Sequence, residues 1–182
     1  MNSTHRGPAR FAALLAPLAI SVAAPAQAQT ATSIIPLPLN PIVSAAQRTC
    51  TTRTPSGLGY TALRQAAGAK PTDGDVVLLG YIGYLAADGS VFDQGQRAPL
   101  AVTDVIPGFT EGLKLMSRGA IYRVCIPAAM GYGAKATGPI PANSDLVFQI
   151  ELLDFKSRAE IEAMRQAQAP GAPATAPAKP GN

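Results

Sequence analysis

The stretch VIPGFTEGLKLM at residues 105–116 decides which fold this sequence predicts. Its Pro-Gly pair is typical of a tight turn. Large apolar residues then recur at offsets of four and three, as on the buried face of a short helix: Phe109, Leu113 and Met116. We therefore expect a helix here. A plain core helix packed on a sheet would have the same pattern, so this stretch alone does not establish a function.

The start of this helix is the first candidate for a binding site. Glu111 is expected in the first helical turn, where unpaired backbone N–H groups favour negative charge. Ile106 then lies on the incoming strand and Phe109 on the first turn. Two apolar side chains beside an exposed N–H group can form a small apolar pocket with one hydrogen-bond donor.

The first 28 residues are typical of a secretory signal peptide. Arg6 and Arg10 precede an almost wholly apolar run at 11–24, and residues 26–28 (AQA) have the small-x-small pattern that signal peptidase cuts. The run is short and contains a proline, and no other segment approaches the roughly 20 apolar residues of a membrane span. We therefore expect an exported protein without a membrane span.

Composition excludes several classes of function. The formal net charge of +4 falls to +2 when the two arginines of the signal are removed, and the chain has no basic stripe, so a nucleic-acid partner is not expected. The only histidine, His5, lies in the signal. The mature chain therefore cannot form a Ser-His-Asp or Cys-His site or a zinc site with His ligands, and its two cysteines are too few for an all-thiolate site. We expect no metal and no cofactor.

The central part of the chain predicts five strands and one helix. Runs of alternating or β-branched apolar residues, separated by turn signals, mark the strands at 58–63, 76–85, 91–93, 121–126 and 146–153. The helix falls between the third and fourth runs, and 128–144 reads as a long loop. This order fits an α+β fold with an antiparallel sheet wrapped around one short helix.

Both ends of the chain differ in composition from this core. Residues 29–49 form a Pro-rich leader, in which the prolines at 36–41 favour extended polyproline geometry and forbid a helix. Residues 157–182 are expected to hold a short polar helix, within 156–168, and then a disordered Ala/Pro-rich tail. The sequence thus predicts flexible termini around one domain at 50–156.

Six stretches together resemble the FKBP-type peptidyl-prolyl isomerases. In chain order they are TPSGLGYTAL, KPTDGDVV, GYIGYLAADGSVFD, VIPGFTEGLKLM, CIPAAMGYG and PIPANSDLVFQIELLDF. The resemblance covers roughly residues 54–155 and keeps its order and spacing throughout. It implies an FKBP-like fold, in which the twisted sheet curls around the short helix and the ligand pocket lies between them.

The resemblance also implies which residues form the pocket. The catalytic positions are Tyr81, Asp93, Ile106 and Tyr132. The substrate-binding positions are Phe92, Val105, Phe109, Ile140 and Phe148. Phe109 stands where many members have Trp, and Ala98, with Leu100 close by, stands where many have a second aromatic wall. These two departures leave the affinity for macrolides open.

A protein with this resemblance is expected to be a peptidyl-prolyl cis-trans isomerase that assists the folding of exported proteins. Its partners would be proline-containing polypeptides, and macrolides of the FK-506 or rapamycin type would be ligands. The periplasm is the expected location, with release into the medium as the alternative. Because Ala98 and Phe109 depart from the family pattern, the competing hypothesis is a proline-peptide binding module or a periplasmic chaperone without turnover.

Cys50 and Cys125 are the only cysteines of the chain. In the family's sheet the first strand runs antiparallel beside the strand that here ends at Cys125, which would place Cys50 nearby. An exported protein folds in an oxidising compartment. We therefore expect a disulfide between them, with two buried free thiols as the alternative.

Overall fold

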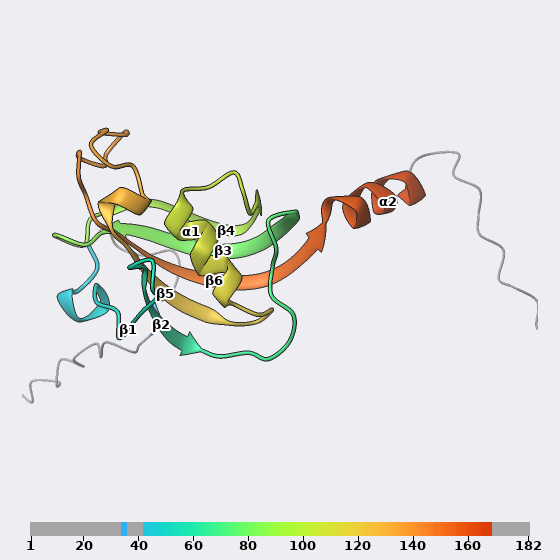
Figure 1. Cartoon of the computed structure of the whole chain (residues 1–182), viewed down its shortest axis with the longest axis horizontal. Coiled ribbons are helices and arrows are strands. Elements are labelled where there is room, and N and C mark those ends of the chain that lie inside the picture. The colour runs from blue at the N-terminus through green and yellow to red at the C-terminus, as the bar shows by residue number, and fades with distance from the viewer. Residues whose placement is uncertain (1–33, 36–41, 169–182) are drawn as a thin grey trace, which may run out of the picture.

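The computed structural model describes residues 34–35 and 42–168. The predicted signal peptide at 1–28, part of the Pro-rich leader and the tail from residue 169 onward lie outside these residues. Figure 1 shows one twisted sheet with a short helix on one face and a second helix at the C-terminal end. This arrangement confirms the predicted α+β fold, an antiparallel sheet around one short helix.

Six strands form the sheet of the described residues, in the order β1-β2-β5-β6-β3-β4, and each neighbouring pair is antiparallel. Their bounds are Thr52–Arg53 (β1), Gly59–Arg64 (β2), Asp75–Leu85 (β3), Val91–Ala101 (β4), Ile121–Ile126 (β5) and Leu146–Ser157 (β6). The five predicted strands correspond to β2 to β6. β4 is much longer than the predicted 91–93, and the short β1 was not predicted.

The predicted helix is α1, Pro107–Leu115. It begins at the proline, which suits the first helical position because the N–H group there has no helical partner in any case. The Pro-Gly pair therefore starts the helix and does not form a turn ahead of it. The expectation that Glu111 lies in the first turn was wrong, since it falls in the second, where its carboxylate accepts a hydrogen bond from the Ser56 hydroxyl (2.7 Å).

Two glycines let α1 lie close to the sheet. Gly108 and Gly112 are four residues apart and share one face of the helix. A Cβ at Gly108 would come within 2.5 Å of Cγ2 of Ile126, and one at Gly112 within 3.1 Å of Cγ1 and Cγ2 of Val124. Both neighbours belong to β5. The helix therefore approaches this strand with the face on which Gly108 and Gly112 carry no side chain. The main core forms around this contact and includes Phe109 and other side chains of α1, β3, β5 and β6.

The opposite, outer face of the sheet carries a second and smaller apolar cluster. Ile82 of β3 and Val147 of β6 contribute to it, together with Ile35 and Val43 from the N-terminal segment, here meaning residues 34–35 and 42–51. The described part of the predicted leader is therefore packed on the sheet. It also contains a short 3-10 helix, η1 (Ala45–Gln47), which was not predicted. This helix lies beyond the prolines at 36–41, so they do not oppose it.

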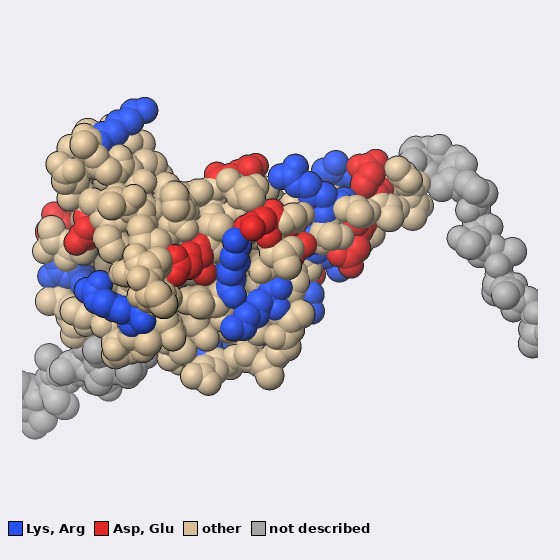
Figure 2. All heavy atoms as spheres, in the orientation of Figure 1, with Lys and Arg blue, Asp and Glu red and all other residues tan. Residues whose placement is uncertain are grey.

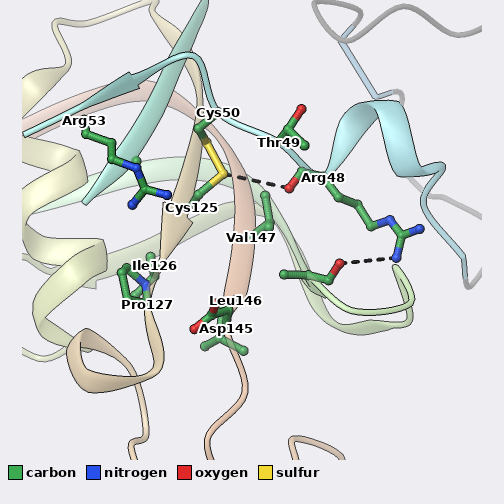
Figure 3. Close-up of a pocket in the computed structure, with 12 residues that line it drawn as sticks. Arg48, Thr49, Cys50, Arg53, Cys125, Ile126, Pro127, Asp145, Leu146 and Val147 are labelled. Atoms are coloured by element: carbon green, nitrogen blue, oxygen red, sulfur yellow. Dashed lines mark hydrogen bonds between the residues drawn. A yellow bond between two sulfur atoms is a disulfide. The ribbon is translucent and has the colours of Figure 1, made fainter. Parts of the chain in front are cut away.

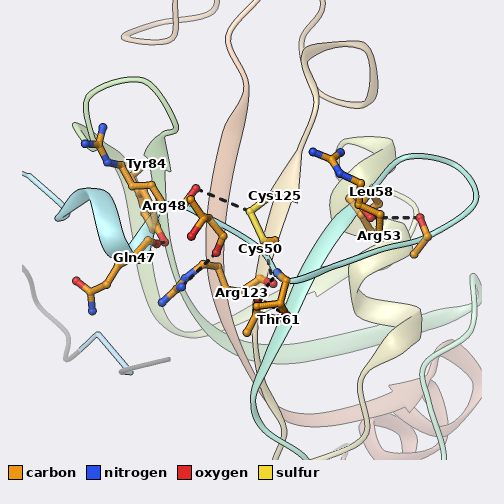
Figure 4. The surroundings of a disulfide bond; sticks show 12 residues. Gln47, Arg48, Cys50, Arg53, Leu58, Thr61, Tyr84, Arg123 and Cys125 are labelled. Carbon is orange, nitrogen blue, oxygen red and sulfur yellow. Dashed lines mark hydrogen bonds between the residues drawn. A yellow bond between two sulfur atoms is a disulfide. The ribbon is translucent and has the colours of Figure 1, made fainter. Parts of the chain in front are cut away.

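Polar side chains on the outer face hold the N-terminal segment by its backbone. The Gln149 side chain accepts a hydrogen bond from the N–H of Ile35 (2.8 Å) and donates one to its C=O (2.9 Å). The Tyr84 hydroxyl donates to the last carbonyl of η1 (2.7 Å), and Arg123 Nη1 donates to the carbonyl of Thr49 (3.3 Å). Figure 4 shows Tyr84 and Arg123 beside this segment. Buried polar groups need such partners. These hydrogen bonds therefore satisfy both the backbone groups of the segment and the polar side chains of the outer face.

A disulfide joins the N-terminal segment to the sheet. Cys50 precedes β1, and Cys125 lies in β5 opposite Gly59 of β2. A Cβ at Gly59 would come within 3.0 Å of Cβ of Cys125 and 3.2 Å of Cβ of Cys50, so the bridge passes β2 where no side chain stands. Figure 4 shows the bridge from Cys50, in the segment before β1, to Cys125 of β5. The predicted pairing of Cys50 with Cys125 is confirmed.

The second helix, α2 (Arg158–Gln168), continues directly from β6 and points away from the body of the sheet in Figure 1. Ser157 and Glu160 form a capping box, since Glu160 Oε2 accepts from the N–H of Ser157 (2.8 Å) and the Ser157 hydroxyl accepts from the N–H of Glu160 (3.2 Å). The predicted short polar helix is confirmed. No helix in the described part of the chain combines the length and apolar character that a membrane crossing requires.

Replacing both cysteines by serine (C50S/C125S) is expected to lower the free energy of unfolding by about 4 kcal/mol, because the bridge closes a loop across 75 positions of sequence. Guanidinium unfolding of the wild type and the double variant measures the difference. Mass spectrometry after alkylation of the unfolded wild type without reductant is the control. Labelling of both thiols there would mean that the bridge does not form.

The buried Tyr84 is expected to make stability depend on pH above about 10. Burial raises the pKa of Tyr84 to about 12, although Arg123 partly opposes this. The unfolded chain therefore loses this proton at lower pH than the folded chain, so stability is constant below about pH 10 and falls between pH 10 and 12, by about 2 kcal/mol. Tyr84→Phe should flatten this decline in urea unfolding at a series of pH values. Parallel curves for wild type and variant would contradict this role.

Candidate active site

A cavity of about 600 Å³ opens on the inner face of the sheet, between β3, β4, β6, the start of α1 and the loop at 131–145. Its volume is in the range of pockets that hold small molecules. The nine residues that the sequence assigned to the pocket all line it, with five others that the sequence did not assign. The whole lining is Tyr81, Phe92, Asp93, Leu100, Asp104, Val105, Ile106, Phe109, Tyr132, Thr137, Gly138, Pro139, Ile140 and Phe148.

Four aromatic rings meet in this cavity, with Phe148 of β6 at their centre. Its ring centroid lies 5.0 Å from that of Phe109 and 5.5 Å from that of Phe92, and both pairs are nearly perpendicular. The Tyr81 ring lies 6.3 Å from Phe109, also edge to face. This arrangement is the one that aromatic rings favour. Phe109 and Phe148 are only 3% and 6% exposed, so they form an apolar floor from which water is largely excluded.

A β-bulge explains why the neighbouring residues Phe92 and Asp93 both face the cavity. In the register of β3 with β4, Gly83 lies opposite Asp93 but Tyr84 lies opposite Val91, so Phe92 is an extra residue on β4. Consecutive strand residues normally point to opposite faces, and a bulge redirects one of them. The same bulge keeps the Phe92 ring against the floor and the Asp93 carboxylate at the exposed edge.

Tyr81 and Asp93 form a hydrogen-bonded pair at this edge. The Tyr81 hydroxyl donates to Oδ2 of Asp93 at 2.8 Å. Burial, followed by this hydrogen bond and the negative charge of Asp93, raises the pKa of Tyr81 to about 12. All three causes favour the neutral phenol. Tyr81 therefore carries a proton throughout the neutral range and keeps Asp93 in a fixed orientation.

Two further donors are free to meet a ligand. In the part of the chain that the structure describes, the N–H of Ile106 has no acceptor, whereas its carbonyl accepts from the N–H groups of Phe109 (2.9 Å) and Thr110 (3.1 Å) as α1 begins. Tyr132, 38% exposed, stands in the loop after the 3-10 helix η2 (Ala128–Met130), and its hydroxyl likewise has no acceptor among the described residues. The cavity thus combines an apolar floor with a few separate polar groups.

Comparisons with known proteins agree with this geometry. The sequence model of a family described as FKBP-type peptidyl-prolyl cis-trans isomerase matches residues 67–153. A crystal structure of a peptidyl-prolyl cis-trans isomerase from Pseudomonas syringae is similar with a TM-score of 0.55 and 35% sequence identity, over 58% of this chain and 80% of that one. The chain belongs to the FKBP-type peptidyl-prolyl cis-trans isomerase family.

Curated relatives also resemble this FKBP-type chain. The outer membrane protein MIP of Legionella longbeachae is 43% identical over 110 residues, which are 58% of this chain and 47% of that protein. The isomerase FkpA of Escherichia coli is 38% identical over 121 residues, 64% of this chain and 44% of that protein. Its crystal structure gives a TM-score of 0.56. The chain spans about half the length of the curated relatives it matches.

The wall of the FKBP-type pocket differs in one place from what the resemblance implied. Leu100 lines the cavity, and Ala98 does not. The two residues are two positions apart on β4, opposite Val77 and Leu79 in register, so they share a face of the sheet. The methyl group of Ala98 is too short to reach the cavity from there. The wall is therefore aliphatic at this point.

The other lining residues that the sequence did not assign lie beside ones that it did. Asp104 directly precedes Val105, and residues 137–139 directly precede Ile140. The N–H and carbonyl groups of Thr137 and Ile140 bond to each other (2.9 and 3.0 Å), which closes a tight turn over the cavity. The Gly-Pro pair at 138–139 favours a turn, and it lies within the segment 128–144 that the sequence predicted only as a long loop.

A second cavity, of about 280 Å³, lies beside the disulfide, as Figure 3 shows. No aromatic ring lines it, and its charged groups already have structural partners. Arg48 Nη1 donates to the carbonyls of Ala86 (3.2 Å) and Ala87 (2.5 Å), and Asp145 accepts from the N–H of Ala128 (2.8 Å). Within the described residues, no group of three or more His, Cys, Asp or Glu is placed to hold a metal ion.

Gly83→Ala is expected to disrupt the aromatic floor. A Cβ at Gly83 would come within 2.5 Å of Cε1 of Phe148 and 2.8 Å of Cε2 of Phe92, so both rings must move. Overpacking of this kind costs about 1 to 3 kcal/mol, and a shift of this size in the floor should weaken ligand binding and turnover about tenfold or more.

The matched control for this change is Gly74→Ala, because a Cβ there meets nothing within 4 Å. Aromatic NMR shifts and denaturant unfolding report the two changes side by side. Equal shifts of the Phe148 and Phe92 ring signals in both variants would contradict the prediction that a side chain at position 83 displaces these rings.

Proposed function

We propose that this protein is a peptidyl-prolyl cis-trans isomerase, which accelerates rotation about X–Pro bonds in exported proteins and so assists their folding. The observation that carries the proposal is the aromatic cavity with its unpaired backbone donor. Its floor of Phe109 and Phe148 suits the flat, apolar proline ring, and the N–H of Ile106 is free to hold a substrate carbonyl beside it.

The apolar floor is the source of catalysis in this proposal. An X–Pro amide rotates over a barrier of about 18 to 20 kcal/mol because resonance keeps it planar. Water stabilises the planar form through hydrogen bonds to its charge-separated carbonyl, and the twisted form has less charge separation. Removing water from the bond therefore lowers the barrier without any proton transfer. A thousandfold acceleration needs only about 4 kcal/mol of such differential stabilisation.

The polar groups around the cavity are proposed to orient the substrate. The N–H of Ile106 and the hydroxyl of Tyr132 would each donate to a substrate carbonyl. The neutral Tyr81 phenol, with Asp93 fixed to it at 2.8 Å, would present its polar atoms near the twisting amide. Phe92, Val105 and the other apolar lining residues assigned from the sequence, Phe109, Ile140 and Phe148, would enclose the proline ring.

Export is part of the proposal. The first 28 residues have the sequence of a signal peptide, and the disulfide between Cys50 and Cys125 suits an oxidising compartment. One similar protein is named an outer membrane protein. We place the protein in the periplasm, with residues 50–156 as the isomerase domain. Clients would then be proline-containing polypeptides that fold after export.

Two observations favour testing a binding module without turnover as the second candidate. Leu100 makes part of the wall aliphatic, and Phe109 provides a smaller floor than Trp would. A protease-coupled assay with a proline tetrapeptide separates the candidates, because binding without acceleration supports the module. A macrolide of the FK-506 or rapamycin type is proposed as a ligand of the same cavity, and it should compete with the peptide in this assay.

Tyr132→Phe and Asp93→Leu are each expected to lower kcat/KM for a proline tetrapeptide about three- to tenfold, which corresponds to the loss of one hydrogen bond. The fold should stay intact because both residues are exposed at the edge of the cavity. Tyr60→Phe is the matched control for the first change, since the Tyr60 ring stacks on Tyr122 outside the cavity. Unchanged kcat/KM in both test variants would remove these side chains from the mechanism.

A further inference from the structure

The charges at the mouth of the cavity have one sign. Asp93 and Asp104 are the only charged side chains among the fourteen lining residues given above, and both are exposed. Lys135 lies in the loop over the cavity, between Tyr132 and Thr137, but does not line it. A bound peptide would therefore leave the apolar floor past two carboxylates.

Neither carboxylate is neutralised by a neighbour. In the described residues, Lys and Arg form ion pairs with four other acidic residues, namely Asp73, Asp154, Glu151 and Glu162. Among the residues that the structure describes, Asp93 accepts only from the neutral Tyr81 hydroxyl, and Asp104 only from the hydroxyl of Thr103, at a long 3.4 Å. Elsewhere the two signs are interspersed on the surface, as Figure 2 shows for one face.

Asp104 lies close in sequence to the backbone donor that is proposed to hold the substrate. It is two residues before Ile106, whose free N–H is the proposed donor to a substrate carbonyl, and one residue before Val105 of the lining. Asp93 lies on β4, a different element of the same cavity. The two charges thus belong to separate elements at the mouth of one cavity.

We propose that these two carboxylates make the site select proline segments flanked by Lys or Arg over segments flanked by Asp or Glu. The inference rests on the proposed function and names its substrate class. An exposed ion pair is worth little on the scale of a buried contact, so the selection is expected to be about two- to fivefold per charge. Its main effect is discrimination, since an acidic flank is repelled by the same groups that attract a basic one.

The test uses the mature full chain and peptides of the form acetyl-Xaa-Ala-Pro-Phe-Xaa-amide. Xaa is Lys, Nε-acetyl-lysine, Gln or Glu, so each charged peptide has a neutral partner of similar shape. Dissociation constants come from NMR titration and exchange rates from magnetisation transfer. The Lys peptide should bind more tightly than its acetylated partner, and the Glu peptide more weakly than the Gln peptide. Equal binding across the four peptides overturns the proposal.

Asp104→Asn should bring the Lys and acetyl-lysine peptides closer together in affinity. Asp73→Asn is the matched control, because it removes the same charge from an exposed residue that lies outside the cavity and pairs with Lys114. Raising the salt from about 0.01 M to about 1 M shortens the Debye length from about 30 Å to about 3 Å and should also abolish the preference. If both variants change the affinity ratio equally, the effect is one of net charge and the proposal fails.

Binding and turnover separate this inference from the function on which it rests. Absence of acceleration for all four peptides, with the Lys preference present in their dissociation constants, would remove the isomerase activity and keep the charge selection. Acceleration of all four peptides, with equal affinities and equal rates, would keep the isomerase activity and remove the charge selection.

Discussion

The close packing of α1 on β5 is the contact on which the rest of the structure depends. Gly108 and Gly112 present no side chain to Ile126 and Val124, so the helix lies directly on the strand. This closeness fixes the depth of Phe109, which points from the first turn into the cavity. It also fixes where the free N–H of Ile106 is presented, since that residue caps the helix. A thicker contact would move the Phe109 ring and the N–H of Ile106 away from Phe148 on the sheet.

The two faces of the sheet have different contacts. The inner face holds the main core and the candidate site, while the outer face binds the N-terminal segment through Gln149, Tyr84, Arg123 and the disulfide. Buried polar groups are costly without partners, and a polar outer face of this kind is stable only while the segment covers it. The N-terminal segment thus covers the polar side chains of the outer face. It also separates the sheet from water on the side opposite the cavity.

Local patterns predicted the parts of the fold that depend on local chemistry. The spacing of Phe109 and Leu113 predicted α1, and the alternation at 121–126 predicted β5. The outer layer was missed because it depends on contacts such as the one from Gln149 to Ile35, 114 positions apart in the sequence, and no local pattern reports these.

The site could be predicted only from the joint occurrence of its motifs. Taken singly, Phe92 and Phe148 have the sequence pattern of ordinary core residues. The family resemblance brought them together, but it could not predict that Leu100 rather than Ala98 reaches the cavity, since this depends on side-chain length at a given register. It also gave no physical reason for the neighbouring side chains of Phe92 and Asp93 to face one cavity. That reason is the bulge opposite Gly83.

The placement of charge around the cavity follows from the chemistry that the cavity is proposed to perform. A carboxylate at the floor would hold water there, and water stabilises the planar amide whose rotation is to be eased. The floor is accordingly made of Phe109 and Phe148, and the carboxylates of Asp93 and Asp104 stand at the exposed edge, where their hydration costs nothing. Tyr81 connects the two regions, since its ring packs on the floor and its hydroxyl donates a hydrogen bond to Asp93. The pKa of Tyr81 is raised to about 12, so the phenol is neutral and places no negative charge beside the floor. The mouth can therefore discriminate by charge while the floor stays dry.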